Sequence, residues 1–317
     1  MRASLLHLDE ALVGQDALLA RVLANDGQSL DLRDLGPRLR LWSRPAALAE
    51  LRGRLRAAMP ANAGPMLVFC GSGDFHHITP ILLQRAIEAP ESQIGGREAV
   101  TVLHFDNHPD WVRFSNGTHC GSWVGQAARL PGVAKVITVG VCSPDIRKPD
   151  PRRADLDLLA EQRLELYAYR DPNGGRSVEL GGRAWPTIEG MGEAAFAALL
   201  CSRIGSEAIY ITIDKDVLSP GDAATNWDQG RTSLSLLKTL LAAALRGRRL
   251  IGADVVGDWS APVYGGGPVT RLLKRGEAWL DQPRTSPDGA ALAANEGVNL
   301  QLLDLLLETP SRLEAVA

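Results

Sequence analysis

Three side chains that can bind metal ions alternate along one short segment of the chain. In HFDNHPDW, residues 104 to 111, Asp106, His108 and Asp110 occupy every second position just after an apolar run. Side chains two positions apart on an extended chain point to the same side, so these three are expected to converge. Carboxylates and imidazoles bind divalent cations, and the spacing therefore indicates a metal site. Because the motif is short, a polar turn with incidental acidic residues is the alternative.

A second apolar run ends with a pair of carboxylates. In ITIDKDVLSP, residues 211 to 220, Asp214 and Asp216 lie on one side of the chain and Lys215 on the other. Alone, this pair is as consistent with a solvated loop as with a binding site. With the first motif it would place four carboxylates in one crevice, where they repel each other unless cations lie among them. Two divalent cations balance four aspartates, so a two-metal site is favoured.

A third group of ligands is expected in the glycine-rich turn CGSGDFHHITP, residues 70 to 80. It contains His76 and His77, one of which would bind metal while the other packs or forms a hydrogen bond. We assign His76 to the metal and leave the role of His77 open. A ligand set with many oxygens and only two imidazoles favours Mn²⁺, two ions per chain, over Zn²⁺ or another divalent metal.

The elements that must position these motifs alternate along the chain. Short β-branched apolar runs predict strands buried on both faces of a sheet. These runs cover residues 66–70, 99–105, 135–141, 207–213 and 250–256. Leu and Ala recur at helical spacing between them. These helical patterns cover residues 45–58, 80–88, 121–129, 190–204 and 232–247. The alternation predicts an α/β fold with a mostly parallel central sheet, whose binding crevice lies at the carboxyl ends of the strands.

The chain of 317 residues shows no internal repeat and no clear linker. A single α/β metallohydrolase domain over residues 1–317 is therefore predicted. Residues 1–60 carry helical patterns and are expected to form a helical extension packed on the domain. Residues 265–317 are expected to form a C-terminal loop and helix.

The composition limits the class of protein. Hydrophobic residues make up 45% of the chain and charged residues 22%, and every apolar run is far shorter than the roughly 20 residues that cross a bilayer. A net charge of −3 with scattered arginines argues against nucleic acid as a partner. Four cysteines without a CxxC pair, and acidic residues where a secretory signal would be apolar, suggest a cytoplasmic protein.

The three motifs together resemble those of the arginase and agmatinase family of ureohydrolases, over about residues 65 to 260. The Gly-Gly-Asp-His-Ser block of that family resembles SGDFHHI, and its Asp-Ala-His-x-Asp block resembles the segment from Asp106 to Asp110. Its Asp-x-Asp block resembles TIDKDVLSP, with Ser219 in place of the usual aspartate before Pro220. The resemblance implies a three-layer α-β-α fold, shared with metal-dependent deacetylases, and assembly into homo-oligomers.

The resemblance also implies a metal site and a reaction. All six metal positions of the family are filled, by His76, Asp106, His108, Asp110, Asp214 and Asp216. Asp106 and Asp214 would bridge two Mn²⁺ ions, and a metal-bridging hydroxide would cleave a linear C–N bond of a small guanidino or amidine substrate. Asp110 would receive the proton of the nucleophile. His119, in NGTHCGSW, would protonate the departing amine. The role of the neighbouring Cys120 is open.

One part of the family pattern is missing. Ureohydrolases place a guanidinium-binding glutamate where GADVVGDWSAP has Gly257, and the acid follows one position later, at Asp258. Asp258 is therefore a candidate substrate contact. Trp227 and Asp228, in TNWDQG, are candidates for the pocket wall. Ordinary turn formation is the alternative for each of these residues.

Two other functions compete with a manganese hydrolase. The first is a Zn²⁺-dependent amide or acetyl-amine deacetylase, in which Asp106, His108 and Asp214 would hold a single ion. The second is a noncatalytic member of the family, which has kept the metal site and lost the substrate acid at Gly257. The sequence does not identify the substrate.

Overall fold

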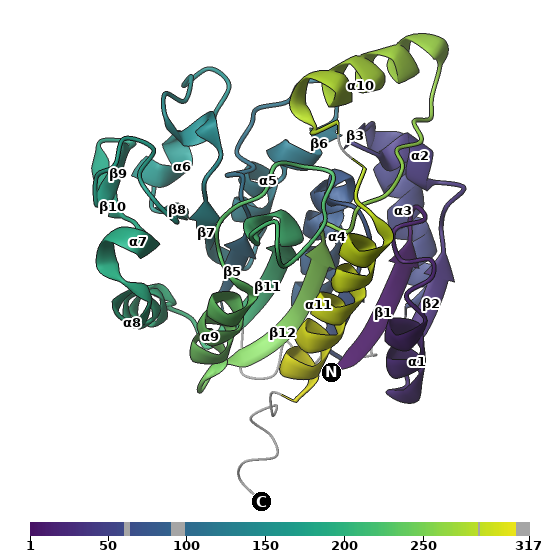
Figure 1. Cartoon of the computed structure of the whole chain (residues 1–317), viewed down its shortest axis with the longest axis horizontal. Helices are drawn as coiled ribbons and strands as arrows, with labels where there is room; N and C mark the ends of the chain where they lie inside the picture. The colour runs from purple at the N-terminus through teal and green to yellow at the C-terminus, as the bar shows by residue number, and fades with distance from the viewer. Residues whose placement is uncertain (60–63, 90–98, 285, 309–317) are drawn as a thin grey trace, which may run out of the picture.

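A computed structural model of the chain describes residues 1–59, 64–89, 99–284 and 286–308. Its centre is an eight-stranded sheet in the order β2-β1-β4-β12-β11-β5-β7-β8, and every neighbouring pair is parallel (Figure 1). The strands are β1 (Arg2–His7), β2 (Gln28–Asp31), β4 (Met66–Phe69), β5 (Val100–Phe105), β7 (Val133–Val141), β8 (Leu164–Ala168), β11 (Ala208–Asp214) and β12 (Arg249–Val256).

Helices cover both faces of the sheet. Figure 1 shows α9 (Leu234–Leu245) and α11 (Gly289–Leu307) in front of the strands and α4 (Thr79–Glu88) behind them. The remaining helices are α1 (Asp16–Ala24), α2 (Gly36–Leu39), α3 (Pro45–Ala58), α5 (Val124–Ala128), α6 (Asp157–Ala160), α7 (Ile188–Met191), α8 (Glu193–Arg203) and α10 (Pro268–Asp281). The predicted three-layer α-β-α fold with a parallel central sheet is confirmed. Within the described residues, no helix is long and apolar enough to cross a membrane.

Two short antiparallel strand pairs lie outside the main sheet. The strand β9 (Ser177–Leu180) pairs antiparallel with β10 (Arg183–Pro186), and β3 (Trp42–Ser43) pairs antiparallel with β6 (Thr118–His119). The second pair sets Trp42 directly opposite His119. It therefore joins the N-terminal part of the chain to the loop that follows the first metal motif.

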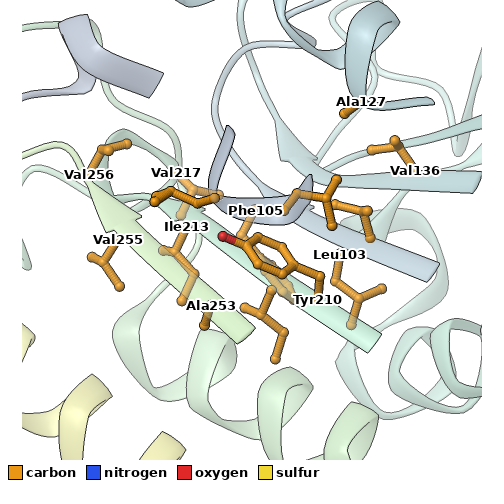
Figure 2. Packing of buried hydrophobic residues seen from close by; sticks show 14 of the residues in the cluster. Leu103, Phe105, Ala127, Val136, Tyr210, Ile213, Val217, Ala253, Val255 and Val256 are labelled. Atoms are coloured by element: carbon orange, nitrogen blue, oxygen red, sulfur yellow. The ribbon is translucent and has the colours of Figure 1, made fainter. Parts of the chain in front are cut away.

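The core keeps the strand ends in register. Phe105, Ile213 and Val255 are fully buried register partners on β5, β11 and β12, and Figure 2 shows them among the packed apolar side chains. Burial of such a side chain contributes about 1.5–3 kcal/mol. Because three neighbouring strands are aligned in this way, the polar residues that follow β5 and end β11 emerge at the same height.

Two expectations about the ends of the chain require correction. Residues 1–60 do not form a purely helical extension, because β1 and β2 extend the sheet beyond β4. The apolar run of β1 has leucines that suit a helix equally well, and pairing with β4 decides its conformation. The C-terminal region contains two helices, α10 and α11, where one was expected.

Candidate active site

The three motifs meet at the carboxyl end of the sheet. Asp106 to Asp110 follow β5, Asp214 ends β11, and the 3₁₀ helix η1 (Gly73–Ile78) after β4 carries His76. The Nδ1 atom of His76 lies 3.1 Å from Asp106 Oδ2, 3.3 Å from Asp110 Oδ2 and 3.6 Å from Asp214 Oδ2. The Nδ1 atom of His108 lies 2.9 Å from Asp216 Oδ2. The structure thus brings together all six side chains proposed as metal ligands.

The hydrogen bonds of His76 show which ring nitrogen faces the carboxylates. Its Nε2 lies 2.8 Å from the hydroxyl of Thr212, and that hydroxyl donates to Asp254 Oδ1 at 2.8 Å. The threonine oxygen must therefore accept from His76, which assigns the proton to Nε2. Nδ1 is buried without a hydrogen-bond partner among the described residues. In the neutral ring the Nδ1 lone pair then points at three carboxylate oxygens, and either a proton on Nδ1 or a metal ion among these atoms would remove the repulsion.

The pKa values of the cluster reflect the repulsion between its buried carboxylates. Burial disfavours a charged His76 ring, but Asp106 and Asp110 outweigh it and raise the pKa of His76 well above its usual value, so that a proton can stand in for a metal. Burial and the neighbouring Asp106 raise the pKa of Asp214 to about 7. Burial, Asp106 and Asp214 raise the pKa of Asp216 well above its ordinary value. Cations among these groups would remove the repulsion.

His104 belongs to the site, although it was not predicted as a ligand. It is buried on β5, with Nε2 2.8 Å from Asp106 Oδ2 and Nδ1 3.0 Å from Thr138 Oγ1. Two groups of described residues could hold an ion, His76 with His104, Asp106 and Asp110, and Asp106 with His108 and Asp216. The signal was present in the sequence, because His104 stands two positions before Asp106 and points to the same side of the strand.

Local backbone conformation supports the cluster at two positions. Asp110 has a positive φ of 48°, which is costly for a residue other than glycine, and its Oδ2 accepts a 2.6 Å hydrogen bond from Trp123 Nε1. A Cβ atom on Gly73 would lie 2.5 Å from Asp214 Oδ2. Glycine at this position therefore lets η1 approach the end of β11.

The structure corrects the expectation that Asp258 contacts the substrate. Asp258 is 1% exposed and lies outside the residues that line the cavity. Its Oδ1 accepts hydrogen bonds from Lys215 Nζ at 2.6 Å and Gln15 Nε2 at 3.0 Å. Gly257 has φ +100°, and a Cβ atom there would lie 2.4 Å from Asp214 Oδ1. The acid at 258 is therefore held in a buried network, and a side chain at 257 has no room.

The cluster opens into a cavity of about 820 Å³, which Trp227, Asp228 and His119 help to line. Asp228 Oδ1 lies 2.9 Å from His108 Nε2, and Trp227 Nε1 donates to Asp74 Oδ1 at 2.9 Å. The helix α10, which lies above the ends of the strands in Figure 1, supplies Glu277 to the wall. Sequence reasoning missed Glu277, because no motif connects it with the other site residues.

The roles of two residues, Cys120 and His77, were left open by the sequence. Cys120 lines the cavity and is 5% exposed, and burial raises the pKa of its thiol well above the ordinary value. His77 is 1% exposed and lies outside the lining residues. Neither of its ring nitrogens has a hydrogen-bond partner within the described part of the chain. Burial lowers the pKa of His77 well below its usual value, which keeps the ring neutral.

Comparison of the sequence with known proteins finds a distant relative but no family model. No protein-family model matches the sequence. An uncharacterized protein of Thermotoga maritima is 26% identical over 212 residues, which are 67% of this chain and 65% of that protein. The match thus spans slightly less than two thirds of the relative's length.

Solved structures match nearly the whole chain at low identity. A hypothetical agmatinase from Burkholderia thailandensis is 19% identical with a TM-score of 0.56, over 97% of this chain and 86% of that one. The arginase of Bacillus subtilis is 14% identical with a TM-score of 0.58, over 98% and 99%. Proclavaminate amidino hydrolase from Streptomyces clavuligerus is 15% identical with a TM-score of 0.55, over 94% and 92%. The chain therefore has the fold of the arginases and agmatinases, carried by a divergent sequence.

Proposed function

We propose that the protein is a binuclear manganese hydrolase that cleaves a linear C–N bond of a guanidino or amidine compound. The observation that carries this proposal is the buried, unpartnered Nδ1 of His76, which faces Asp106, Asp110 and Asp214. A proton or a metal ion must lie at this point, and an oxygen-rich set with two or three imidazoles suits Mn²⁺.

Each residue of the site would have a defined role in metal binding or proton transfer. His76, Asp106, Asp110 and Asp214 would hold one ion, and Asp106, His108, Asp214 and Asp216 the other, with His104 supporting Asp106. Two such ions supply a water whose pKa is lowered toward neutrality. Asp110 would accept a proton at its carboxylate. His119, in the cavity wall, would deliver a proton to the departing amine.

The charge of the cavity supports a cationic substrate. Outside the cluster, its wall contains five carboxylates, Asp145, Asp150, Asp228, Glu277 and Asp281. Only two cationic side chains, Lys148 and Arg153, line the same cavity among the described residues. An amidinium or guanidinium group is planar and carries one positive charge, so this wall would attract it. Since a side chain at position 257 has no room and Asp258 is buried, the carboxylate that meets the substrate would come from this wall.

Turnover and metal content test the proposal together. The metal content of the purified protein would be measured first. The protein would then be incubated, with Mn²⁺ present, with agmatine, arginine, guanidinobutyrate, guanidine and formamide-type amides, while urea and ammonia are measured. We expect release from at least one cationic amidine, about two Mn per chain, and loss of turnover in Asp106→Asn. One Zn per chain with amide cleavage would instead support the deacetylase.

Metal binding without any turnover would support a noncatalytic member of the family. The predictions of a cytoplasmic location, a homo-oligomer and a small-molecule partner belong to this proposal as well.

A further inference from the structure

His119 and Glu277 form a direct contact between distant parts of the chain. The Nε2 atom of His119 lies 2.6 Å from Glu277 Oε1. His119 follows the first metal motif on β6, whereas Glu277 lies in the C-terminal helix α10. Both side chains line the cavity, and they are 13% and 26% exposed. Both side chains are therefore largely shielded from solvent, which strengthens their interaction, and both can still contact a substrate in the cavity.

The hydrogen bonds around His119 determine which ring nitrogen carries the proton. Its Nδ1 accepts a hydrogen bond from the backbone N–H of Gly121 at 2.9 Å. In the neutral ring the proton must then sit on Nε2, where Glu277 Oε1 accepts it. The other oxygen of the same carboxylate, Oε2, accepts from Trp42 Nε1 at 3.0 Å. One carboxylate thus satisfies two donors from the facing strands β3 and β6.

Contacts on both sides of Glu277 hold α10 in place. One turn earlier, the buried Lys274 donates to the carbonyl of Arg38 at 3.2 Å and lies 4.8 Å from the Trp42 ring centroid. At the end of the helix, Gln282 Nε2 donates to Asp74 Oδ1 at 2.6 Å, in the same 3₁₀ helix as His76. The carboxylate of Glu277 is therefore set in position by contacts that do not depend on His119.

We propose that Glu277 is the positioning residue of His119, and that α10 completes the proton-transfer site by holding the ring through its Nε2–H at the cavity wall. This inference rests on the proposed function for its catalytic meaning, although the contact itself can be tested without turnover. The backbone N–H of Gly121 at Nδ1 sets the tautomer of the neutral ring, and a carboxylate that accepts from its Nε2–H sets the direction of the ring.

Glutamine at position 277 provides a discriminating test. Glutamine has the shape of glutamate but only one acceptor oxygen, while Trp42 Nε1 and His119 Nε2 both donate to the side chain. In Glu277→Gln, one of the two donors must face an N–H group. Removing the indole donor with Trp42→Phe releases this conflict, so the double variant should recover what the single variant loses.

The readout is the Nε2–H proton resonance of His119, measured by ¹H–¹⁵N NMR on protein with labelled histidine, alongside kcat and KM. A carboxylate is a stronger acceptor than an amide, so in Glu277→Gln we expect this resonance to move to higher field. We also expect a fall in kcat of about 10-fold or more, with a smaller change in KM. Glu277→Gln with Trp42→Phe should return both toward the wild-type values. Arg275→Gln, an exposed position on the same helix, is the matched control and should change neither.

The outcomes separate the two proposals. An unchanged Nε2–H resonance in Glu277→Gln overturns the positioning role, whatever the turnover shows. A resonance that shifts and is partly restored by Trp42→Phe supports it. If that pattern appears in a protein that hydrolyses no substrate, the positioning contact stands and the hydrolase function is rejected.

Discussion

The Nζ atom of Lys215 lies 2.6 Å from Oδ1 of Asp258, and both side chains are buried, although Lys215 stands between Asp214 and Asp216 in the chain. Asn299 Oδ1 accepts a second hydrogen bond from the same Nζ at 3.0 Å. Lys215 therefore ties the second metal motif to the end of β12 and to α11. This contact explains why an acid next to the position of the family's glutamate does not reach the cavity.

Breaking this ion pair should destabilise the protein. Lys215→Met leaves the Asp258 carboxylate buried without its cation, and we expect a loss of about 3–5 kcal/mol in the free energy of unfolding. Denaturant titration followed by circular dichroism measures the change. Lys215→Met combined with Asp258→Asn removes both charges and should be less destabilised than Lys215→Met alone. If the free energy of unfolding of Lys215→Met were within about 0.5 kcal/mol of the wild-type value, the structural role would be contradicted.

Metal binding should weaken as the pH falls through neutrality. Burial and Asp106 raise the pKa of Asp214 from 3.8 to about 7, so below this pH a proton competes with the ion. Calorimetric titration with Mn²⁺ at about pH 6 and about pH 8, one below and one above this pKa, should show tighter binding at the higher pH. It should also show greater proton release at the lower pH. Equal affinity at both values would mean that Asp214 binds no proton in the metal-free site.

The same pKa shift makes an opposite prediction for the stability of the metal-free protein. Because the folded state keeps a proton on Asp214 that the unfolded chain loses near pH 3.8, the folded state binds more protons across that window. The contribution of Asp214 to stability therefore falls as the pH rises from about 4 to 7. Thermal unfolding with a chelator should show this decline, and Mn²⁺ should offset it. A stability that rises over this range with chelator alone would count against the charge repulsion described for the cluster.

His104 should matter for metal affinity. In His104→Asn, Asp106 loses a 2.8 Å contact to Nε2, and we expect Mn²⁺ affinity to fall by about 10–100-fold. Thr138→Val removes only the partner of Nδ1 and should have a smaller effect. Mn²⁺ titration of the two variants compares them directly. If His104→Asn bound Mn²⁺ with wild-type affinity, the proposed role of His104 in the metal site would be contradicted.

A side chain at position 257 should disrupt the centre. The Cβ of Gly257→Ala would lie 2.4 Å from Asp214 Oδ1 at a φ of +100°, so we expect weaker metal binding and a loss of stability of more than about 1 kcal/mol. Gly257→Glu should likewise fail to create a guanidinium site. Gly276→Ala, in α10 with nothing within 4 Å, is the control and should gain about 0.5–1 kcal/mol. Normal metal binding in Gly257→Ala would show that the loop adapts.

The cluster of candidate metal ligands could be predicted because its signals are local. Alternating Asp106, His108 and Asp110 share a side of the chain through backbone geometry alone, and each of the five predicted strands corresponds to one in the sheet. Strands β1, β2 and β8 were missed, because short leucine-containing runs suit helices and strands alike until a neighbouring strand pairs with them.

Other features depend on contacts that no local pattern encodes. Asp258 was predicted to contact the substrate, but it is instead the buried partner of Lys215, which lies against it in the folded chain. The role of Glu277 depends on the path of α10 over the strand ends, which brings it to His119 from 158 positions further along the chain.

The amino-acid sequence by itself determined the alternation of strands and helices, the parallel sheet and the candidate ligands at the ends of its strands. These follow from residue type and from spacings of two or about four positions, which the backbone converts directly into shared faces. Only the tertiary structure decided which acids reach the cavity and which are buried. That choice depends on how distant elements pack, and on whether each buried charge finds a partner in the folded chain.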